Sequence, residues 1–405
     1  MNARTMKSIS SLAAAVVLWA GITTVQAAAA APGAPTTATN SALAEKLVGQ
    51  IADIQRDEFV QILGSVADLQ LLEDLAVAVR KRGAYPMIMI HSATLIRRMV
   101  DEVPERFDSQ MPQFELNLAG FVSAVIEVDI PDWEKALAGV PASRLALVNK
   151  ASDAPYKRWT DRNVRYVELG LGLTPTASRA ALFGMSEAEL RKIYEEGLNV
   201  DYSQMQATAE KTKSILSAGK RLHLTAPGGT DLTLDTVGQS TGASDGIITP
   251  EKRKAGGIAC QTCLPAGEVW VRPVADSAEG KVVFDHFYFE FKDCSNVVFN
   301  VKAGKITGIT AETGLERLRE VYAAAAPGRE RLTAIDLGIN PNIRLAPGSR
   351  LRAYCPAGMV TVSFGDDIGW GGDQSNGFQF CGQVANGTLT LDGKTLIENG
   401  ELKVK

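Results

Sequence analysis

Two cysteines and one carboxylate stand within one short stretch of the chain, Cys260–Trp270 (CQTCLPAGEVW). Cys260 and Cys263 have C-x-x-C spacing, and Glu268 follows in the same stretch. Thiolates and a carboxylate can hold a transition metal, whereas two thiols in an oxidising compartment can form a disulfide. The stretch therefore raises three alternatives: a metal site, a disulfide, or ordinary structure.

The C-x-x-C pair alone is weak evidence for a metal, because zinc sites usually combine two such pairs or one pair with histidines. A redox pair is expected at a helix N-terminus, where the helix dipole lowers the thiol pKa. This pair instead precedes Leu264 and Pro265, and it is predicted to lie in a loop that leads into a strand. The pattern favours a structural loop or disulfide over metal ligation, and metal ligation over thiol–disulfide chemistry.

Other polar residues add carboxylates but few nitrogen ligands. Asp336 lies among apolar residues in AIDLGINPN, and a buried carboxylate is costly unless it is paired or metal-bound. The glycine-rich loop Gly365–Gly377 (GDDIGWGGDQSNG) suits a hard cation, and equally a plain surface turn. The three histidines, His91, His223 and His286, are isolated from one another, so each is predicted to be a structural or surface residue. No nucleophile-elbow sequence supports a serine or cysteine hydrolase.

The N-terminus has the pattern of a secretory signal. Arg4 and Lys7 precede an apolar run, Leu12–Gly21, and Val25–Ala27 fits the small-x-small pattern of a cleavage site. The apolar run is short for a permanent anchor. We expect a signal peptide over residues 1–27 and a flexible linker over residues 28–41. The mature protein would then be periplasmic or secreted, without membrane contact; an uncleaved anchor is the alternative.

Export would place five cysteines in an oxidising compartment, where some can pair and an odd number leaves at least one over. The formal net charge of −4 is spread along the chain. No basic stripe of the kind that binds nucleic acid is present, so that class of partner is excluded.

The hydrophobic pattern predicts two domains. Residues 42–220 alternate helical stretches with short apolar runs, which indicates an α/β domain with a mainly parallel sheet. Residues 221–405 consist mostly of short alternating strands between Gly, Asp and Asn turns, which indicates a β-rich, barrel-like domain. Ser186 and Glu189 form a capping box at a helix start. The predicted helices of the first domain are 65–83, one that starts at the capping box, and one through 205–220. Its predicted strands are 86–90, 119–129, 144–150 and 165–171.

Several ordered motifs resemble the aminopeptidase T family, the thermophilic or leucyl type of metalloaminopeptidase. GGTDLTL (228–234), LPAGEVWVRPVADSAEGKVVFD (264–285) and DLGINPNIR (336–344) resemble segments of that family, as do SFGDDIGWGGDQS and LDGKTLIENGEL. The resemblance covers about residues 184–402. It implies the same two-domain architecture, two divalent cations, a homodimer, and removal of N-terminal amino acids from peptides.

The metal ligands implied by the resemblance are only partly present. Glu268 is kept, and Asp336 replaces a glutamate with a shorter carboxylate. Two histidines and an aspartate of the family fall on Thr361, Gln379 and Cys381. Threonine and glutamine are weak ligands, whereas imidazole supplies much of the affinity in nitrogen and oxygen sites. The chain is therefore not expected to bind two metals in the family's manner.

The same resemblance places Cys381 near Glu268. One hypothesis is a substitute thiolate site made of Cys263, Cys381 and Cys260 with Glu268 or Asp336, which would hold zinc or another divalent transition metal. The rival is a disulfide between Cys381 and Cys260 or Cys263, with no metal.

Three functions follow from these observations. The first is an exported aminopeptidase-like hydrolase with a remodelled metal site. The second is a non-catalytic descendant that binds a small molecule or peptide. The third is a relative of the metal-dependent ring-cleaving dioxygenases, which would need the same missing histidines.

Overall fold

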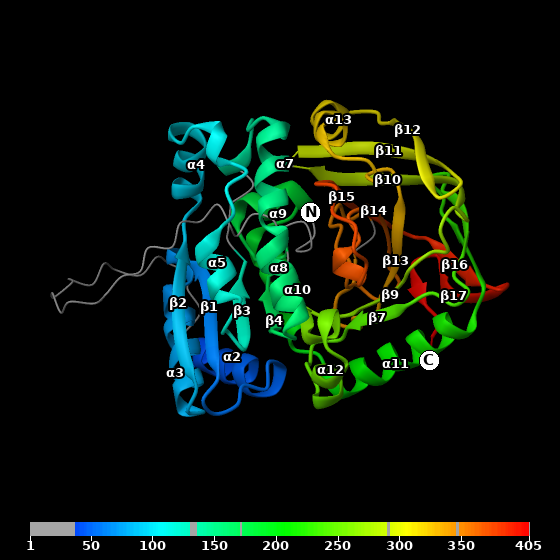
Figure 1. Cartoon of the computed structure of the whole chain (residues 1–405). Coiled ribbons are helices and arrows are strands. Elements are labelled where there is room, and N and C mark those ends of the chain that lie inside the picture. The colour runs from blue at the N-terminus through cyan, green and yellow to red at the C-terminus, as the bar shows by residue number, and fades with distance from the viewer. Residues whose placement is uncertain (1–36, 130–135, 171, 290–291, 346–347, 405) are drawn as a thin grey trace.

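The computed structural model describes residues 37–129, 136–170, 172–289, 292–345 and 348–404. The predicted signal peptide and nearly all of the linker lie outside these residues. Figure 1 shows an α/β part beside a larger part built mostly of strands. Among the described residues, no helix is long and apolar enough to cross a membrane.

The α/β part is built on a five-stranded sheet, sheet A, with the order β2-β1-β3-β4-β8 and only parallel pairs. Strands β3 and β4 are buried along their whole length, as expected for a parallel sheet covered on both faces. The strands are β1 Phe59–Ser65, β2 Tyr85–His91, β3 Ala124–Val128, β4 Arg165–Leu169 and β8 Gln261–Leu264. The helices are α2 Thr37–Lys46, α3 Leu69–Lys81, α4 Ala93–Glu102, α5 Gln113–Leu118, α7 Ala142–Ala151, α8 Asp153–Asp161, α9 Ala177–Phe183, α10 Glu187–Leu198 and α11 Tyr202–Ala218.

The parallel α/β sheet and the Ser186–Glu189 capping box of α10 are confirmed. The strand predicted over 144–150 is wrong, because this segment is helix α7. The helix starts directly after Pro141, and Arg144 turns inward to bind Asp108, with 2.6 Å between Nε and Oδ2. Leu145 and Val148 fit helical spacing as well as a strand, so the short apolar run was ambiguous.

The β-rich part contains two antiparallel sheets. Sheet B has eight strands in the order β12-β11-β10-β6-β5-β16-β17-β18, and sheet C has five in the order β15-β14-β13-β9-β7. Sheet B consists of β5 Arg221–Thr225, β6 Asp231–Asp235, β10 Glu279–Phe289, β11 Lys292–Lys302, β12 Lys305–Thr310, β16 Thr388–Leu391, β17 Lys394–Glu398 and β18 Glu401–Leu402. Sheet C consists of β7 Thr241–Ser244, β9 Glu268–Val271, β13 Leu332–Gly338, β14 Val360–Gly365 and β15 Gln379–Val384. The helices here are α12 Pro250–Ala255 and α13 Leu315–Ala324.

Short turns of other helix types complete the described elements. They are the π-helix η2 Leu47–Ile51 and the 3₁₀ helices η3 Val66–Asp68, η4 Glu105–Phe107, η5 Gly257–Cys260 and η6 Ile368–Trp370. The predicted boundary at residue 220 stays a prediction, although the chain re-enters sheet A after it, through β8.

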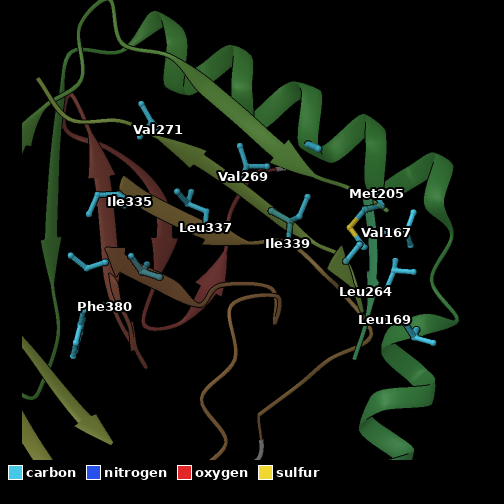
Figure 2. Packing of buried hydrophobic residues seen from close by; sticks show 14 of the residues in the cluster. Val167, Leu169, Met205, Leu264, Val269, Val271, Ile335, Leu337, Ile339 and Phe380 are labelled. Carbon is cyan, nitrogen blue, oxygen red and sulfur yellow. The ribbon is translucent and has the colours of Figure 1, made fainter. Parts of the chain in front are cut away.

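One hydrophobic core joins the two parts. Figure 2 shows Met205 of α11 next to Leu264 of β8, and Val269 of β9 belongs to the same cluster. The same core holds Ile335 and Leu337 of β13. Because side chains alternate along a strand, the residues between these apolar ones point to the opposite face of sheet C. That opposite face carries the candidate site.

Candidate functional site

The second face of sheet C is a row of buried polar residues. Asp336 on β13 lies opposite Trp270 on β9 and opposite Thr361 on β14, and Thr361 lies opposite Gln383 on β15. Directly paired residues of antiparallel strands share one face. Glu268, two positions before Trp270, belongs to the same face, and all five side chains are buried. We call this row the polar face.

The polar face contains three of the residues predicted from the sequence, and a fourth lies close to it. Glu268, Asp336 and Thr361 lie on adjacent strands, and Cys381 pairs with Ser363 further along β14 and β15. Gln379, in contrast, lies opposite Gly365 at the end of the β14–β15 pair.

Gln383 is the neighbour of Thr361, and the sequence analysis missed it. The resemblance placed residues by motif spacing, whereas the register of the strands decides which side chains meet. The alternation in QFCGQV puts Gln379, Cys381 and Gln383 on one face and was the available signal.

A tryptophan from the glycine-rich loop binds the central carboxylate. The indole Nε1 of Trp370 donates a hydrogen bond to Asp336 Oδ1 at 3.0 Å, and the Ser363 hydroxyl lies 3.5 Å from Oδ2. Trp370 is only 1% exposed. It packs with Trp270 and Cys381 in one buried cluster. Two indoles therefore pack together at the polar face, one from β9 and one from η6.

The polar face does not suit the family's two-cation centre. Hydrogen-bond donors occupy both oxygens of Asp336. Thr361 lies at the position where the resemblance predicts a histidine, and within the described residues its buried hydroxyl has no hydrogen-bond partner. No described group of three or more His, Cys, Asp and Glu residues could hold a metal ion. The substitute site of Cys260, Cys263 and Cys381 with Glu268 or Asp336 is therefore not assembled.

The C-x-x-C pair lies at the start of β8 of sheet A rather than in a loop of the β-rich part. Cys260 ends η5, and Cys263 lies within β8 beside Glu168 of β4, with 3.9 Å between Sγ and Oε2. All five cysteines are buried. Cys381 lies on β15 of sheet C and packs with Trp270 and Trp370. A disulfide between Cys381 and Cys260 or Cys263 stays a prediction.

The glycine-rich loop folds on its own carboxylates. The Asp367 carboxylate accepts from the backbone N–H of Gln374 at 2.7 Å and from the Arg272 guanidinium at 2.6 Å. Asp366 accepts from the backbone N–H of Asn376, and burial raises the pKa of Asp366 to about 7. These bonds stabilise the turn that presents Trp370, so its aspartates have a structural role rather than that of cation ligands.

The histidines also agree with their predicted structural roles. His223 contacts Asp231 at 2.8 Å and His286 contacts Asp293 at 2.9 Å, both within sheet B. His91 is buried at the end of β2, and burial lowers its pKa to about 4.

Sheet A buries a second row of polar groups that the sequence analysis did not identify. Glu127 of β3, Glu168 of β4 and Cys263 of β8 are in register. The Tyr166 hydroxyl donates to Glu127 at 2.6 Å. Burial raises the pKa of Glu127 to about 7 despite this bond.

This carboxyl predicts a pH-dependent stability. Between the ordinary pKa of 4.5 and about 7, folded Glu127 keeps a proton that the unfolded chain has lost. The free energy of unfolding should therefore fall as the pH rises through this window. In Glu127→Gln, the decrease in the free energy of unfolding between pH 4 and pH 8 should be smaller by about 3 kcal/mol. Urea denaturation across this pH range measures the difference. Glu73→Gln, at an exposed position of α3, is the control and should leave the pH profile unchanged.

The fold and the polar face together define a class: a parallel α/β sheet fused through one core to antiparallel sheets, with two carboxylates on adjacent strands of sheet C. The chain belongs to the thermophilic metalloprotease (M29) family, whose profile matches residues 37–340. The resemblance predicted from the sequence is thereby confirmed. Membership supports a metallopeptidase-like function at the level of the family, whose members use divalent metals.

Two solved structures share the fold. Wild-type AmpT from Thermus thermophilus matches with a TM-score of 0.68 and 18% identity, covering 91% of this chain and 100% of that one. The 2,5-dihydroxypyridine dioxygenase from Pseudomonas putida matches with a TM-score of 0.56 and 14% identity, covering 92% of this chain and 99% of that one. No curated protein sequence matches the chain. At these identities the likeness concerns the fold alone.

Proposed function

We propose that this chain is an exported, peptide-binding member of the metalloprotease family in which a tryptophan-covered polar face replaces the two-metal hydrolytic centre. The bond from the Trp370 indole to Asp336 carries the proposal, because it places a neutral donor on a carboxylate that would otherwise be a ligand. A hydrolytic metal needs several ligands that hold it while a water is activated. Thr361 and Gln383, the next residues in the row, are neutral and weak ligands.

A remodelled aminopeptidase is the second candidate, and the two retained carboxylates, Glu268 and Asp336, favour it. Hydrolysis of leucine p-nitroanilide separates the two. The proposal expects no rate above that of the Glu268→Gln variant, with or without added zinc, cobalt or manganese. A metal-dependent rate that Glu268→Gln abolishes would favour the aminopeptidase instead. The dioxygenase alternative has no comparable support in this chain beyond a shared fold.

Export gives a separate prediction. Expression of the full chain in a bacterium should yield a periplasmic protein that begins at Ala28, because the small-x-small pattern ends at Ala27. N-terminal sequencing of the periplasmic fraction measures this. An intact N-terminus in the membrane fraction would show the uncleaved anchor instead. The homodimer implied by the resemblance likewise stays a prediction, and sedimentation of the same material would test it.

A further inference from the structure

Strand β7 is the outer strand of sheet C, and within the described residues no strand pairs with its second edge. Its only partner among the described strands is β9, with Gly242 opposite Trp270. The carbonyl groups of Ser240 and Ser244 accept from β9-side amides at 3.1 and 2.9 Å. Hydrogen-bonded and non-hydrogen-bonded residue pairs alternate along two antiparallel strands. Every second residue of β7 therefore directs its backbone N–H and C=O groups away from β9. Those residues are Thr241 and Ala243.

A cavity of about 710 Å³ runs along this free edge. Helix α11 forms one wall, with Gln206, Glu210 and Lys213 on one stripe, and α12 with η5 forms the other. Thr241 and Ala243 themselves line the cavity. The volume is within the range of small-molecule sites in proteins. An extended chain of about four residues matches the length of β7, at roughly 3.4 Å per residue.

Charges of both signs surround the cavity. On α11, Lys213 Nζ lies 2.8 Å from Glu210 Oε1. On the opposite wall, Lys252 is bound to the buried carboxylate of Asp245, and Glu251 stands next to it. A ligand that carries an ammonium group at one end and a carboxylate at the other complements such walls. A short peptide with free ends is a ligand of this kind.

Trp270 links the cavity to the polar face. Its indole lines the cavity and also packs with Trp370. Gly242 leaves room for the ring, because a Cβ there would lie 2.2 Å from it. A side chain of a bound peptide that points to this face would therefore contact the indole, which offers a large apolar surface.

We infer that a short peptide with free ends binds along β7 in extended conformation and adds a sixth strand to sheet C. Its backbone bonds to the outward N–H and C=O groups of Thr241 and Ala243, as in other cases of strand addition. Its charged ends are received by the walls that carry Glu210, Lys213 and Glu251. The inference rests on the proposed peptide-binding function and adds the place and the mode of binding.

The first test needs no variant. Isothermal titration calorimetry with tetra-alanine should give saturable one-to-one binding to the mature protein. Tetra-alanine with N-methyl groups on alternate amides loses its donors on one edge and should bind at least about tenfold more weakly, since each lost hydrogen bond costs about 1 kcal/mol. The acetylated and amidated peptide should also bind more weakly. Absence of saturable binding, or equal affinity for the N-methylated peptide, would overturn the inference.

Ala243→Pro tests the protein's side of the contact. Proline removes the outward N–H and leaves the pairing with β9 intact, a position that edge strands tolerate. Ala243→Pro should weaken tetra-alanine binding about tenfold. Ala243→Val introduces a side chain similar in size to proline but keeps the N–H, so its affinity should stay within about twofold of wild type. Equal losses in both variants would contradict a backbone contact. Circular dichroism and the thermal midpoint confirm that both variants are folded.

The outcomes separate this inference from the proposed function. Metal-dependent cleavage of tetra-alanine would refute the proposed function. Weaker binding of the N-methylated peptide would still support the β7 site, and equal binding would overturn it. Saturable binding that neither N-methylation nor Ala243→Pro affects would keep the proposed function and overturn the β7 site. Binding that appears only in protein lacking the N-terminal linker would show that this chain's own segment occupies the edge, and it would also overturn the inference.

Discussion

Trp370→Phe should lower the free energy of unfolding by about 3 kcal/mol. The substitution keeps an aromatic ring but removes the indole N–H, whose nitrogen lies 3.0 Å from Asp336 Oδ1. Trp370 and Asp336 are each only 1% exposed. A hydrogen bond to a charged group contributes about 1.5–3 kcal/mol, and the smaller ring leaves a void. Equilibrium unfolding in urea measures the loss.

Trp159→Phe is the matched control. Trp159 is partly buried, less completely than Trp370, and within the described residues its indole nitrogen has no hydrogen-bond partner. The control therefore loses the same atoms without the bond to a carboxylate, and we expect a cost below half that of Trp370→Phe. In an Asp336→Asn background, the cost of Trp370→Phe should also shrink, because the acceptor no longer carries a charge. Equal costs in the two backgrounds would show that the bond to Asp336 contributes little.

Arg179→Met should have the other large effect, a loss of about 3–5 kcal/mol in the free energy of unfolding. Arg179 of α9 binds Asp129, which follows β3, and their side chains are 3% and 0% exposed. Removing the guanidinium leaves a buried carboxylate with only weaker donors, of which the Thr174 hydroxyl at 3.0 Å is one. Such a charge is costly to keep in the protein interior.

The exposed pair of Arg97 and Asp101 provides the control for this prediction. Their side chains are 40% and 49% exposed, so solvent screens the interaction. Arg97→Met should change the free energy of unfolding by less than about 0.5 kcal/mol. The double variant Arg179→Met with Asp129→Leu should recover much of the loss, because neither charge remains buried alone. A double variant as unstable as Arg179→Met would point to packing rather than charge.

The architecture could be predicted well because hydrophobic periodicity can be recognised in a single sequence. The alternation that identified the β-rich part also places Val269, Ile335 and Leu337 in the core. It failed at residues 144–150, where a short apolar run fits a strand and a helix equally and Pro141 decides for the helix. Strand β8 was harder still, since its pairing with β4 joins segments far apart in the chain.

The site could be predicted only in part. Motif order pointed to Glu268 and Asp336, and the family resemblance predicted that Thr361 and Cys381 replace ligands of the family. The contact between Trp370 and Asp336 joins a loop to a strand, and no local sequence pattern predicts it. The sequence of the loop alone is equally typical of a turn and of a cation site. Gln383 was missed because its importance depends on the register of β14 and β15.

The metal content of the mature protein tests the central claim most directly. The protein would be purified from the periplasm without chelators or a metal-binding tag, and its metals measured by mass spectrometry after equilibration with zinc, cobalt or manganese and gel filtration. The account predicts less than about 0.1 equivalent of any transition metal, and the same value for Glu268→Gln, because the polar face lacks a ligand set for a hydrolytic cation. One or two equivalents that Glu268→Gln or Asp336→Asn removes would contradict it and identify a working metal centre.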